Sequence, residues 1–369
     1  MIPVFEPLIG DEEISNVTDA LRRGEISGSF GTYIPAFEKA FAEFCGTRYA
    51  VAVSSGTTAL HLAVAAAGFG RGDEILVSAS TNVATALAAY NNGATVVPVD
   101  SGADTWNLDP DLIEGLITEK TKAIIPVHLF GHPADMDAIV KIASKHNLMV
   151  IEDCAESHGA LCRGRMTGTF GQMACFSFYA NKIITTGEGG MVVTNDEALF
   201  EKLKLLRNLA FTQPRFRHEV AGFNFRMTGY QAAMGLAQVK KIESIIETKR
   251  QIAAWYHKYL QAERMLQLPC EKEWARNVYW MYAVVLDPSA LVSRDELMTR
   301  LSAAGIETRT FFCPMNLQPF LIGSERYRDA SCPVAEKIWK QGLYLPSSLS
   351  LKEEDIRFIS GVINEQLKS

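Results

Sequence analysis

The sequence predicts an α/β fold in which a mostly parallel β-sheet is covered by helices on both faces. Short apolar runs alternate with helical stretches from about residue 45 to residue 210, as in chains built from β–α–β units. The runs are nearly continuous in Val, Ile and Ala, which is typical of strands buried on both faces. The length of 369 residues leaves room for a large domain and a smaller one.

The predicted elements follow one another in a regular order. A helix at residues 12–22 precedes the alternating region. Seven strands are then predicted, at residues 49–54, 74–78, 95–100, 122–127, 148–152, 173–178 and 190–195. The clearest helices between them lie at residues 58–67, 134–146 and 197–207.

The C-terminal part has a different pattern. A helical pattern runs from Gly229 past Arg250 and leads to a strand at residues 279–286, a helix at 294–304 and a second strand near 306–312. We therefore predict a large domain at residues 1–245 and a smaller α/β domain at 246–369. The N-terminal segment can pack against the smaller one.

Composition excludes several classes of protein. A net charge of −6 gives no reason to expect a nucleic-acid partner. No apolar run is long enough to span a membrane, and the first residues do not resemble a signal peptide. The seven cysteines form no C-x-x-C pair and the seven histidines show no ligand spacing, so we expect no metal site. These features predict a cytoplasmic protein.

Three residues together predict a chemical site. Lys182 lies between two strand-like runs, Asp153 ends the run at 148–152, and Ser177 precedes the lysine by five residues. A lysine alone would more often lie on the surface. A desolvated lysine can form a Schiff base, an aspartate can pair with a pyridinium nitrogen, and a serine can bind phosphate. The set predicts a pyridoxal 5'-phosphate (PLP) site.

The segment 54–59 adds a possible phosphate site. It follows a strand and opens a helix, so free backbone N–H groups lie at its start. Gly56 permits close approach of the backbone and Thr57 adds a hydroxyl, although simple N-capping would account for the same residues. Glu156, three residues after Asp153, is within reach of the cofactor's phenolic edge. Because parallel sheets bind ligands at the carboxyl ends of their strands, we expect these residues to meet there.

At this point the chain resembles a known family, the PLP-dependent sugar-nucleotide aminotransferases of fold type I. The resemblance covers nearly the whole chain. It rests on the segments 55–62, 105–110, 127–133, 152–156, 168–171, 181–196, 222–228, 305–309 and 345–348.

The resemblance implies a role for each matching position. It implies Lys182 as the Schiff-base lysine and Asp153 at the pyridine nitrogen. The implied phosphate ligands are Gly56, Thr57 and Ser177, with Glu156 near the phenolic oxygen. Asn224 would reach the cofactor of a neighbouring subunit, which implies a homodimer with shared active sites. Substrate contacts are expected from Asn82, His158, Arg309 and Asn316.

Three positions depart from the family pattern. Asn82 stands where many members have an aromatic residue against the cofactor ring, and Asn316 where many have a histidine near the sugar. Glu25 replaces a tryptophan found in members that act on GDP-4-keto-6-deoxymannose. All three are expected close to the substrate.

The resemblance implies amino transfer from L-glutamate to a nucleotide-linked keto-sugar, for making deoxyaminosugars of surface polysaccharides or glycosides. A substrate like GDP-4-keto-6-deoxymannose is expected first, and a UDP- or dTDP-linked 3- or 4-keto-sugar next. A PLP dehydratase, a desulfurase or a non-catalytic relative are the alternatives. Related dehydratases carry a histidine at the position of Lys182, so the lysine favours amino transfer.

Overall fold

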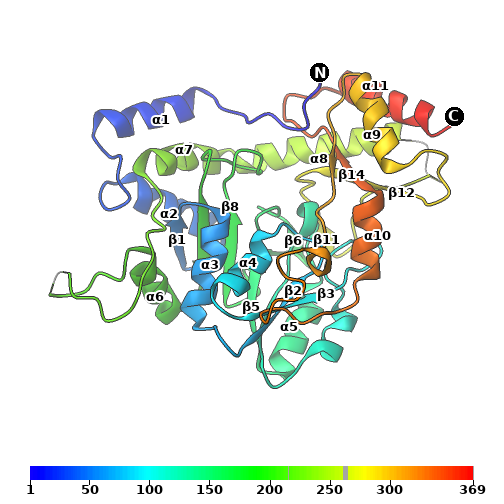
Figure 1. Ribbon diagram of the computed structural model, residues 1–369. Coiled ribbons are helices and arrows are strands. Elements are labelled where there is room, and N and C mark those ends of the chain that lie inside the picture. The colour runs from blue at the N-terminus through cyan, green and yellow to red at the C-terminus, as the bar shows by residue number, and fades with distance from the viewer. Residues whose placement is uncertain (215, 261–264, 369) are drawn as a thin grey trace.

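The large sheet lies at the centre of the computed structural model, which describes residues 1–214, 216–260 and 265–368 (Figure 1). Its strand order is β1-β9-β8-β5-β4-β2-β3, and only β9 runs antiparallel to its neighbours. The strands are β1 (Tyr49–Val53), β2 (Glu74–Ser78), β3 (Thr95–Val99), β4 (Thr121–Ile125), β5 (Met149–Asp153), β8 (Met173–Ser177) and β9 (Gly190–Thr194). All seven predicted strands, and the mostly parallel sheet, are confirmed.

Helices cover both faces of this sheet because its strands bury alternate residues on opposite sides. Val51 and Val53 pack with α3 (Gly56–Ala67), α4 (Ala84–Asn91) and α6 (Glu197–Arg207). Ala50 and Ala52 face the opposite cluster, which includes α2 (Tyr33–Cys45). Further along the sheet, α5 (Met136–Lys145) covers β3, β4 and β5 on that second face. The arrangement is the three-layer α/β architecture that the sequence predicted.

A second, antiparallel sheet forms from C-terminal strands in the order β10-β12-β14-β13. Its strands are β10 (Leu266–Gln267), β12 (Tyr282–Leu286), β13 (Arg309–Thr310) and β14 (Gly342–Leu345). The helices α8 (Ile242–Tyr259), α9 (Arg294–Ala303) and α11 (Glu353–Gln366) share a hydrophobic cluster with it. A three-stranded sheet of β6 (Leu161–Cys162), β7 (Arg165–Met166) and β11 (Ala275–Arg276) lies beside the large one.

The predicted long helix after Gly229 is two helices in line. The first, α7 (Gly229–Lys240), is separated from α8 by one residue, and the two run along one side of the molecule (Figure 1). Helix α1 (Asp11–Arg22) packs on α7. Ahead of α1, Ile2 pairs with Ile306 and the Val4 N–H donates to Glu307 Oε2. The N-terminal segment therefore packs on the C-terminal sheet, and the domain boundary at residue 245 stays a prediction.

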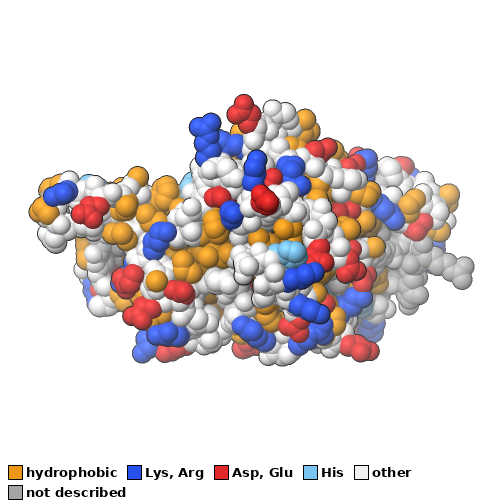
Figure 2. All heavy atoms as spheres, turned by 90° about the horizontal axis from the view of Figure 1, so that it is seen from below, with side chains coloured by type: hydrophobic (Ala, Val, Ile, Leu, Met, Phe, Trp, Pro, Cys, Tyr) orange, Lys and Arg blue, Asp and Glu red, His pale blue; other side chains and the backbone are white. Residues whose placement is uncertain are grey.

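The sequence was least informative in the C-terminal part. The strand predicted at 279–286 begins only at Tyr282, because Tyr279 has a left-handed φ of 47° that breaks the extended chain. The sequence pattern did not predict α2, α4, α11, β14 or α10 (Pro333–Gln341). No helix in the described part of the chain is long and apolar enough to cross a membrane. On the face seen in Figure 2, acidic and basic side chains are interspersed.

Candidate active site

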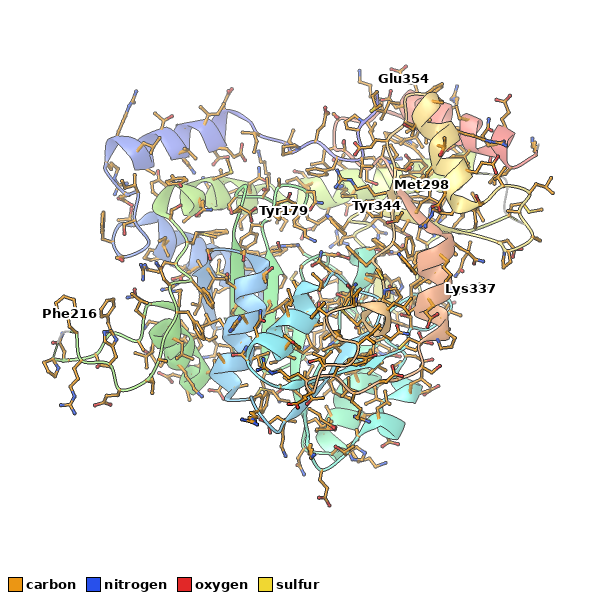
Figure 3. The ribbon with its side chains drawn as sticks, in the orientation of Figure 1. Tyr179, Phe216, Met298, Lys337, Tyr344 and Glu354 are labelled. Atoms are coloured by element: carbon orange, nitrogen blue, oxygen red, sulfur yellow. The ribbon has the colours of Figure 1, made fainter. Side chains whose placement is uncertain are left out.

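A cavity of about 380 Å³ opens at the carboxyl ends of the large sheet's parallel strands. Its wall combines residues that follow β1, β5 and β8 with residues from the C-terminal sheet. Figure 3 labels two of them, Tyr179 just after β8 and Tyr344 on β14, which lie at a similar height beneath α7 and α8. The wall includes seven of the predicted cofactor or substrate residues beside Lys182: Gly56, Thr57, Asn82, Asp153, Glu156, Ser177 and Arg309.

Lys182 is almost withdrawn from solvent and has two close neighbours. Its Nζ lies 3.6 Å from Glu156 Oε1 and 3.8 Å from the centre of the Trp280 ring. Burial lowers the pKa of the Lys182 amine, and the carboxylates of Glu156 and Asp153 partly oppose this. A lower pKa leaves more of the amine in the neutral, nucleophilic form.

Asp153 ends β5 with its carboxylate facing the cavity wall. Thr85 Oγ1 donates to Asp153 Oδ2 at 2.7 Å and the Ala155 N–H donates to Oδ1 at 3.1 Å. Burial raises the pKa of Asp153, against the lowering effect of the Thr85 hydrogen bond. Among the described residues Asp153 has no ion-pair partner within 4 Å, so a buried carboxylate held in this way favours a protonated ligand nitrogen as its partner.

Glu156 lies between the reactive lysine and the backbone of residue 130. Its Oε2 accepts the Phe130 N–H at 2.8 Å. Burial raises the pKa of Glu156 to about 7, while Lys182 and the Phe130 N–H lower it. Glu156 can therefore hold or release a proton near neutral pH, at the place where a phenolic oxygen of the cofactor is expected.

The predicted phosphate ligands meet at the start of α3. Ser55 caps the helix by accepting the Thr58 N–H at 3.1 Å, which leaves the N–H groups of Gly56 and Thr57 without an intrahelical acceptor. A Cβ at Gly56 would lie 2.6 Å from the Cβ of Ser177. The glycine is therefore required for the helix start and the serine to lie this close. The N-cap is observed, and the anion cradle stays a prediction.

The other predicted substrate residues lie in three different environments. Asn82 is exposed at the cavity wall, and its Oδ1 accepts the Ala84 N–H. His158 is fully buried among Phe41, Phe176 and Phe178 and is not part of the wall. Burial lowers the pKa of His158 to about 3, so it stays neutral. We therefore assign His158 to packing behind the site instead of to substrate contact.

Asn316, Glu25 and Asn224 also lie outside the cavity wall. Asn316 donates to Glu336 Oε1 at 2.8 Å. The Glu25 carboxylate accepts the backbone N–H groups of Thr32 and Tyr33 and so shapes its own loop. Asn224 is exposed on the segment that follows the protruding residues 209–214 and 216–220, of which Phe216 is labelled in Figure 3. The expected substrate contacts of Asn316 and Glu25 are not made within this cavity.

Three residues of the site were not singled out from the sequence. Thr85 orients Asp153, Trp280 covers Lys182, and Tyr344 lines the wall. Thr85 lies in the first turn of α4, and the apolar residues of this helix show no strong helical periodicity in the sequence. Trp280 was predicted only as a strand residue, and Tyr344 lay in no predicted element. Their place across the cavity gives both residues a role.

One buried group of metal-ligand types, His128, Glu152 and Cys154, is present in the described part of the chain. Glu152 already accepts the N–H groups of Gly168, Phe170 and Gly171, and His128 lies 3.2 Å from it. His128 Nδ1 accepts the Ala134 N–H, so its Nε2 carries the proton and donates to Glu152. These bonds account for the group as a structural network that supports the strand ends.

The residues of the cavity fit PLP on their own chemistry. An amine of lowered pKa, a buried carboxylate without a permanent cation and an anion cradle that needs glycine are the three features that the cofactor's aldehyde, ring nitrogen and phosphate require.

Comparisons with known proteins agree with this geometry. The model of the DegT/DnrJ/EryC1/StrS aminotransferase family matches residues 7–364. GDP-perosamine synthase of Caulobacter vibrioides is 41% identical over 368 residues, covering 99% of this chain and 98% of that protein. GDP-perosamine synthase of Escherichia coli O157:H7 is 42% identical over 365 residues, with the same coverage of 99% and 98%.

A solved structure extends the agreement to three dimensions. The crystal structure of Streptomyces venezuelae DesV in complex with a ketimine intermediate superposes with a TM-score of 0.90 at 36% identity, covering 97% of this chain and 95% of that one. The chain belongs to the DegT/DnrJ/EryC1/StrS aminotransferase family and is an enzyme of the transaminase class.

Proposed function

We propose that this enzyme binds PLP in the cavity and transfers an amino group from L-glutamate to the ketone of a nucleotide-linked sugar. The observation that carries the proposal is the position of Lys182, whose amine of lowered pKa lies among Glu156, Asp153 and Trp280. When bound, PLP supplies the electron sink that stabilises negative charge at the donor's Cα.

The chain's own residues divide the remaining work. Lys182 attaches the cofactor and, once released, moves the proton from the donor's Cα. Asp153 keeps the ring nitrogen protonated, and Thr85 holds that carboxylate in place. Ser177, Thr57 and the N–H groups at the start of α3 bind the phosphate. Glu156 holds or releases a proton at the phenolic oxygen, since its pKa is about 7.

The proposed acceptor is a sugar like GDP-4-keto-6-deoxymannose. Two GDP-perosamine synthases match this chain over almost their full length, which supports this choice. Asn82 lines the cavity with an amide group where an aromatic ring is usual in the family, and this would change how the sugar is held. A UDP- or dTDP-linked 3- or 4-keto-sugar is the alternative acceptor.

A homodimer with shared sites is part of the proposal. Asn224 is exposed and outside its own chain's cavity, so its proposed contact with a cofactor is made in the partner. Hydrophobic side chains gather on the loops beside it: Ile26, Phe30, Leu209, Phe211 and Val220 are all at least one-third exposed. Gly28 packs against Arg226, which joins the two loops into one surface. A second copy of the chain would remove these side chains from water.

A panel assay tests the proposal. The purified holoenzyme is incubated with L-glutamate and, in turn, with GDP-, UDP- and dTDP-linked 4-keto-6-deoxy-sugars and with dTDP-linked 3-keto-sugars, and amino-sugar formation is followed by mass spectrometry. We expect the GDP-linked sugar to have the highest kcat/KM. A dehydrated product in place of an aminated one, or no product from any sugar, would contradict the proposal.

A further inference from the structure

The cavity has very little positive charge for an enzyme that must bind an amino acid. Among the described residues of its wall, the cationic side chains are Lys182 and Arg309, while Asp153, Glu156 and Glu188 are acidic. Lys182 is committed to the cofactor under the proposed function. Arg309 is therefore the cation left to bind a carboxylate from this chain.

Arg309 is placed to make such a contact. It lies on β13, directly across from Tyr344 on β14, and both residues line the cavity. Glu156 and Lys182 line the same cavity, so Arg309 and Tyr344 share it with the reactive amine. Burial raises the pKa of Tyr344 to about 12, so the phenol keeps its proton. A guanidinium and a phenol side by side offer the N–H and O–H groups that a carboxylate accepts.

Arg309 already has a carboxylate partner, and that partner is replaceable. Its guanidinium lies 3.3 Å from Glu307 Oε1, with side-chain exposures of 57% for Arg309 and 35% for Glu307. Exposed ion pairs of this kind are weak. Glu307 itself is held elsewhere, because its Oε2 accepts the Val4 N–H at 3.0 Å. Glu307 would therefore keep its position, through the Val4 N–H, if Arg309 bound another anion.

The two half-reactions make opposite demands on this arginine. The donor carries carboxylates, whereas the sugar that follows it in the same cavity is neutral around the reacting carbon. Without the donor, the half-exposed guanidinium keeps only solvent and the Glu307 carboxylate as partners. We propose that Arg309, together with Tyr344, binds a carboxylate of the amino donor, and that Glu307 takes the place of that carboxylate when the sugar is bound. This role rests on the proposed amino transfer, and it assigns recognition of the amino donor to Arg309 and Tyr344.

Separate half-reactions test this. The change in cofactor absorbance on mixing holoenzyme with L-glutamate gives the donor KM, and the reverse change with the keto-sugar gives the acceptor KM. Arg309→Met is expected to raise the donor KM by about 10- to 100-fold, as loss of a charged bidentate contact does, with less than about a 3-fold change in acceptor KM. The affinity for glutarate, an unreactive dicarboxylate measured by calorimetry on the holoenzyme, should fall in parallel.

Glu307→Gln tests the exchange. The amide oxygen can still accept the Val4 N–H, but the charge that competes for Arg309 is gone, so the donor KM should fall by about 2- to 5-fold. In the Arg309→Met background the same change should have no effect, because the competitor has lost its target. Arg300→Met on α9 removes another partly exposed arginine, one paired with Glu296 outside the cavity, and serves as the matched control.

The two half-reaction measurements distinguish between the donor carboxylate and the sugar diphosphate as the anion that Arg309 binds. If Arg309→Met raised the acceptor KM instead, the arginine would bind the sugar diphosphate, and the inference would be overturned. Equal losses in both half-reactions, an unchanged donor KM, or a Glu307→Gln variant with an unchanged donor KM would also overturn it. L-Glutamine and L-alanine lack the side-chain carboxylate of L-glutamate, so their donor KM values show whether Arg309 binds the α-carboxylate or the side-chain carboxylate. Failure of every keto-sugar would reject the proposed acceptor alone, because 2-oxoglutarate can replace the sugar in the reverse step.

Discussion

The Lys182 amine and the Glu156 carboxylate lie 3.6 Å apart, and both side chains are nearly closed off from water. Burial lowers the pKa of the amine and raises that of the carboxyl to about 7. The two shifts narrow the gap between the ordinarily distant pKa values of an amine and a carboxyl group, which favours proton exchange between them.

Lys182 should be the residue that carries the cofactor. Borohydride reduction of the holoenzyme followed by peptide mapping should find the cofactor on the Lys182 peptide. Lys182→Ala should still bind PLP but form no amino-sugar, whereas Lys145→Ala, which alters a surface ion pair with Glu114, should behave as wild type. An adduct on any other lysine would remove Lys182 from its role.

Asp153→Asn should keep the fold and lose kcat by about 100-fold or more, because a neutral amide does not hold the ring nitrogen protonated. The asparagine oxygen can still accept the Thr85 hydroxyl. Circular dichroism checks that the variant is folded, and steady-state kinetics measure the decrease in kcat. Thr85→Val, which removes only the orienting hydrogen bond, should show a smaller decrease. Wild-type kcat in the asparagine variant would show that the carboxylate has no electronic role.

Gly56→Ala should weaken PLP binding through the phosphate cradle. The added methyl would lie 2.6 Å from the Ser177 Cβ, so the helix start and the serine must move apart. We expect the Kd for PLP, measured by fluorescence titration of the apoprotein, to rise about 10-fold or more, by analogy with overpacked sites. Gly115→Ala is the matched control, because its Cβ would have no neighbour within 4 Å. Equal PLP affinity in the two variants would contradict the cradle.

Lys249 should make stability depend on pH in an unusual direction. It is buried, its Nζ donates to the carbonyl oxygens of Trp280 and Ser347, and burial lowers its pKa to about 7. A neutral amine has two N–H groups, which is enough for both carbonyls. Between pH 7 and about 10.5 the unfolded chain therefore binds more protons at this residue than the folded chain does.

The stability advantage of wild type over Lys249→Met should consequently grow as pH rises from 7 to 9, by up to about 1.4 kcal/mol per pH unit. Urea unfolding of both proteins at pH 7, 8 and 9 measures the difference, in which other titrating groups largely cancel. A difference that is constant or shrinks with rising pH would mean that Lys249 is charged in the folded protein.

Two inactive variants should restore activity together if active sites are shared. In a mixed dimer of Lys182→Ala and Asn224→Ala chains, one site carries both changes and the other carries neither. Random exchange gives about half mixed dimers, so about a quarter of wild-type activity should return after co-refolding equal amounts. Asn224→Ala must first be strongly impaired by itself. No recovery, despite subunit exchange seen with tagged chains, would show that each site is built from one chain.

The sequence alone predicted the seven strands of the large sheet and the residues at their ends. Buried parallel strands leave continuous apolar runs, and the topology of such sheets brings their carboxyl ends to one edge. Asp153, Ser177 and the Ser55–Gly56 turn could therefore be placed in one site before any coordinates were known. The same reasoning singled out Lys182 by its place between two such runs.

Only the tertiary structure decided what surrounds that lysine. Thr85 and Asp153 are 68 residues apart in the chain, and the Trp280 Nε1 donates to the Asn181 carbonyl 99 residues away. The first contact depends on how α4 packs beside β5, and the second on how the C-terminal part of the chain packs over the large sheet. No local pattern in the sequence records this tertiary packing. It is also why His158, which follows a strand as Asp153 does, is enclosed by aromatic rings while Arg309, from the opposite sheet, reaches the cavity.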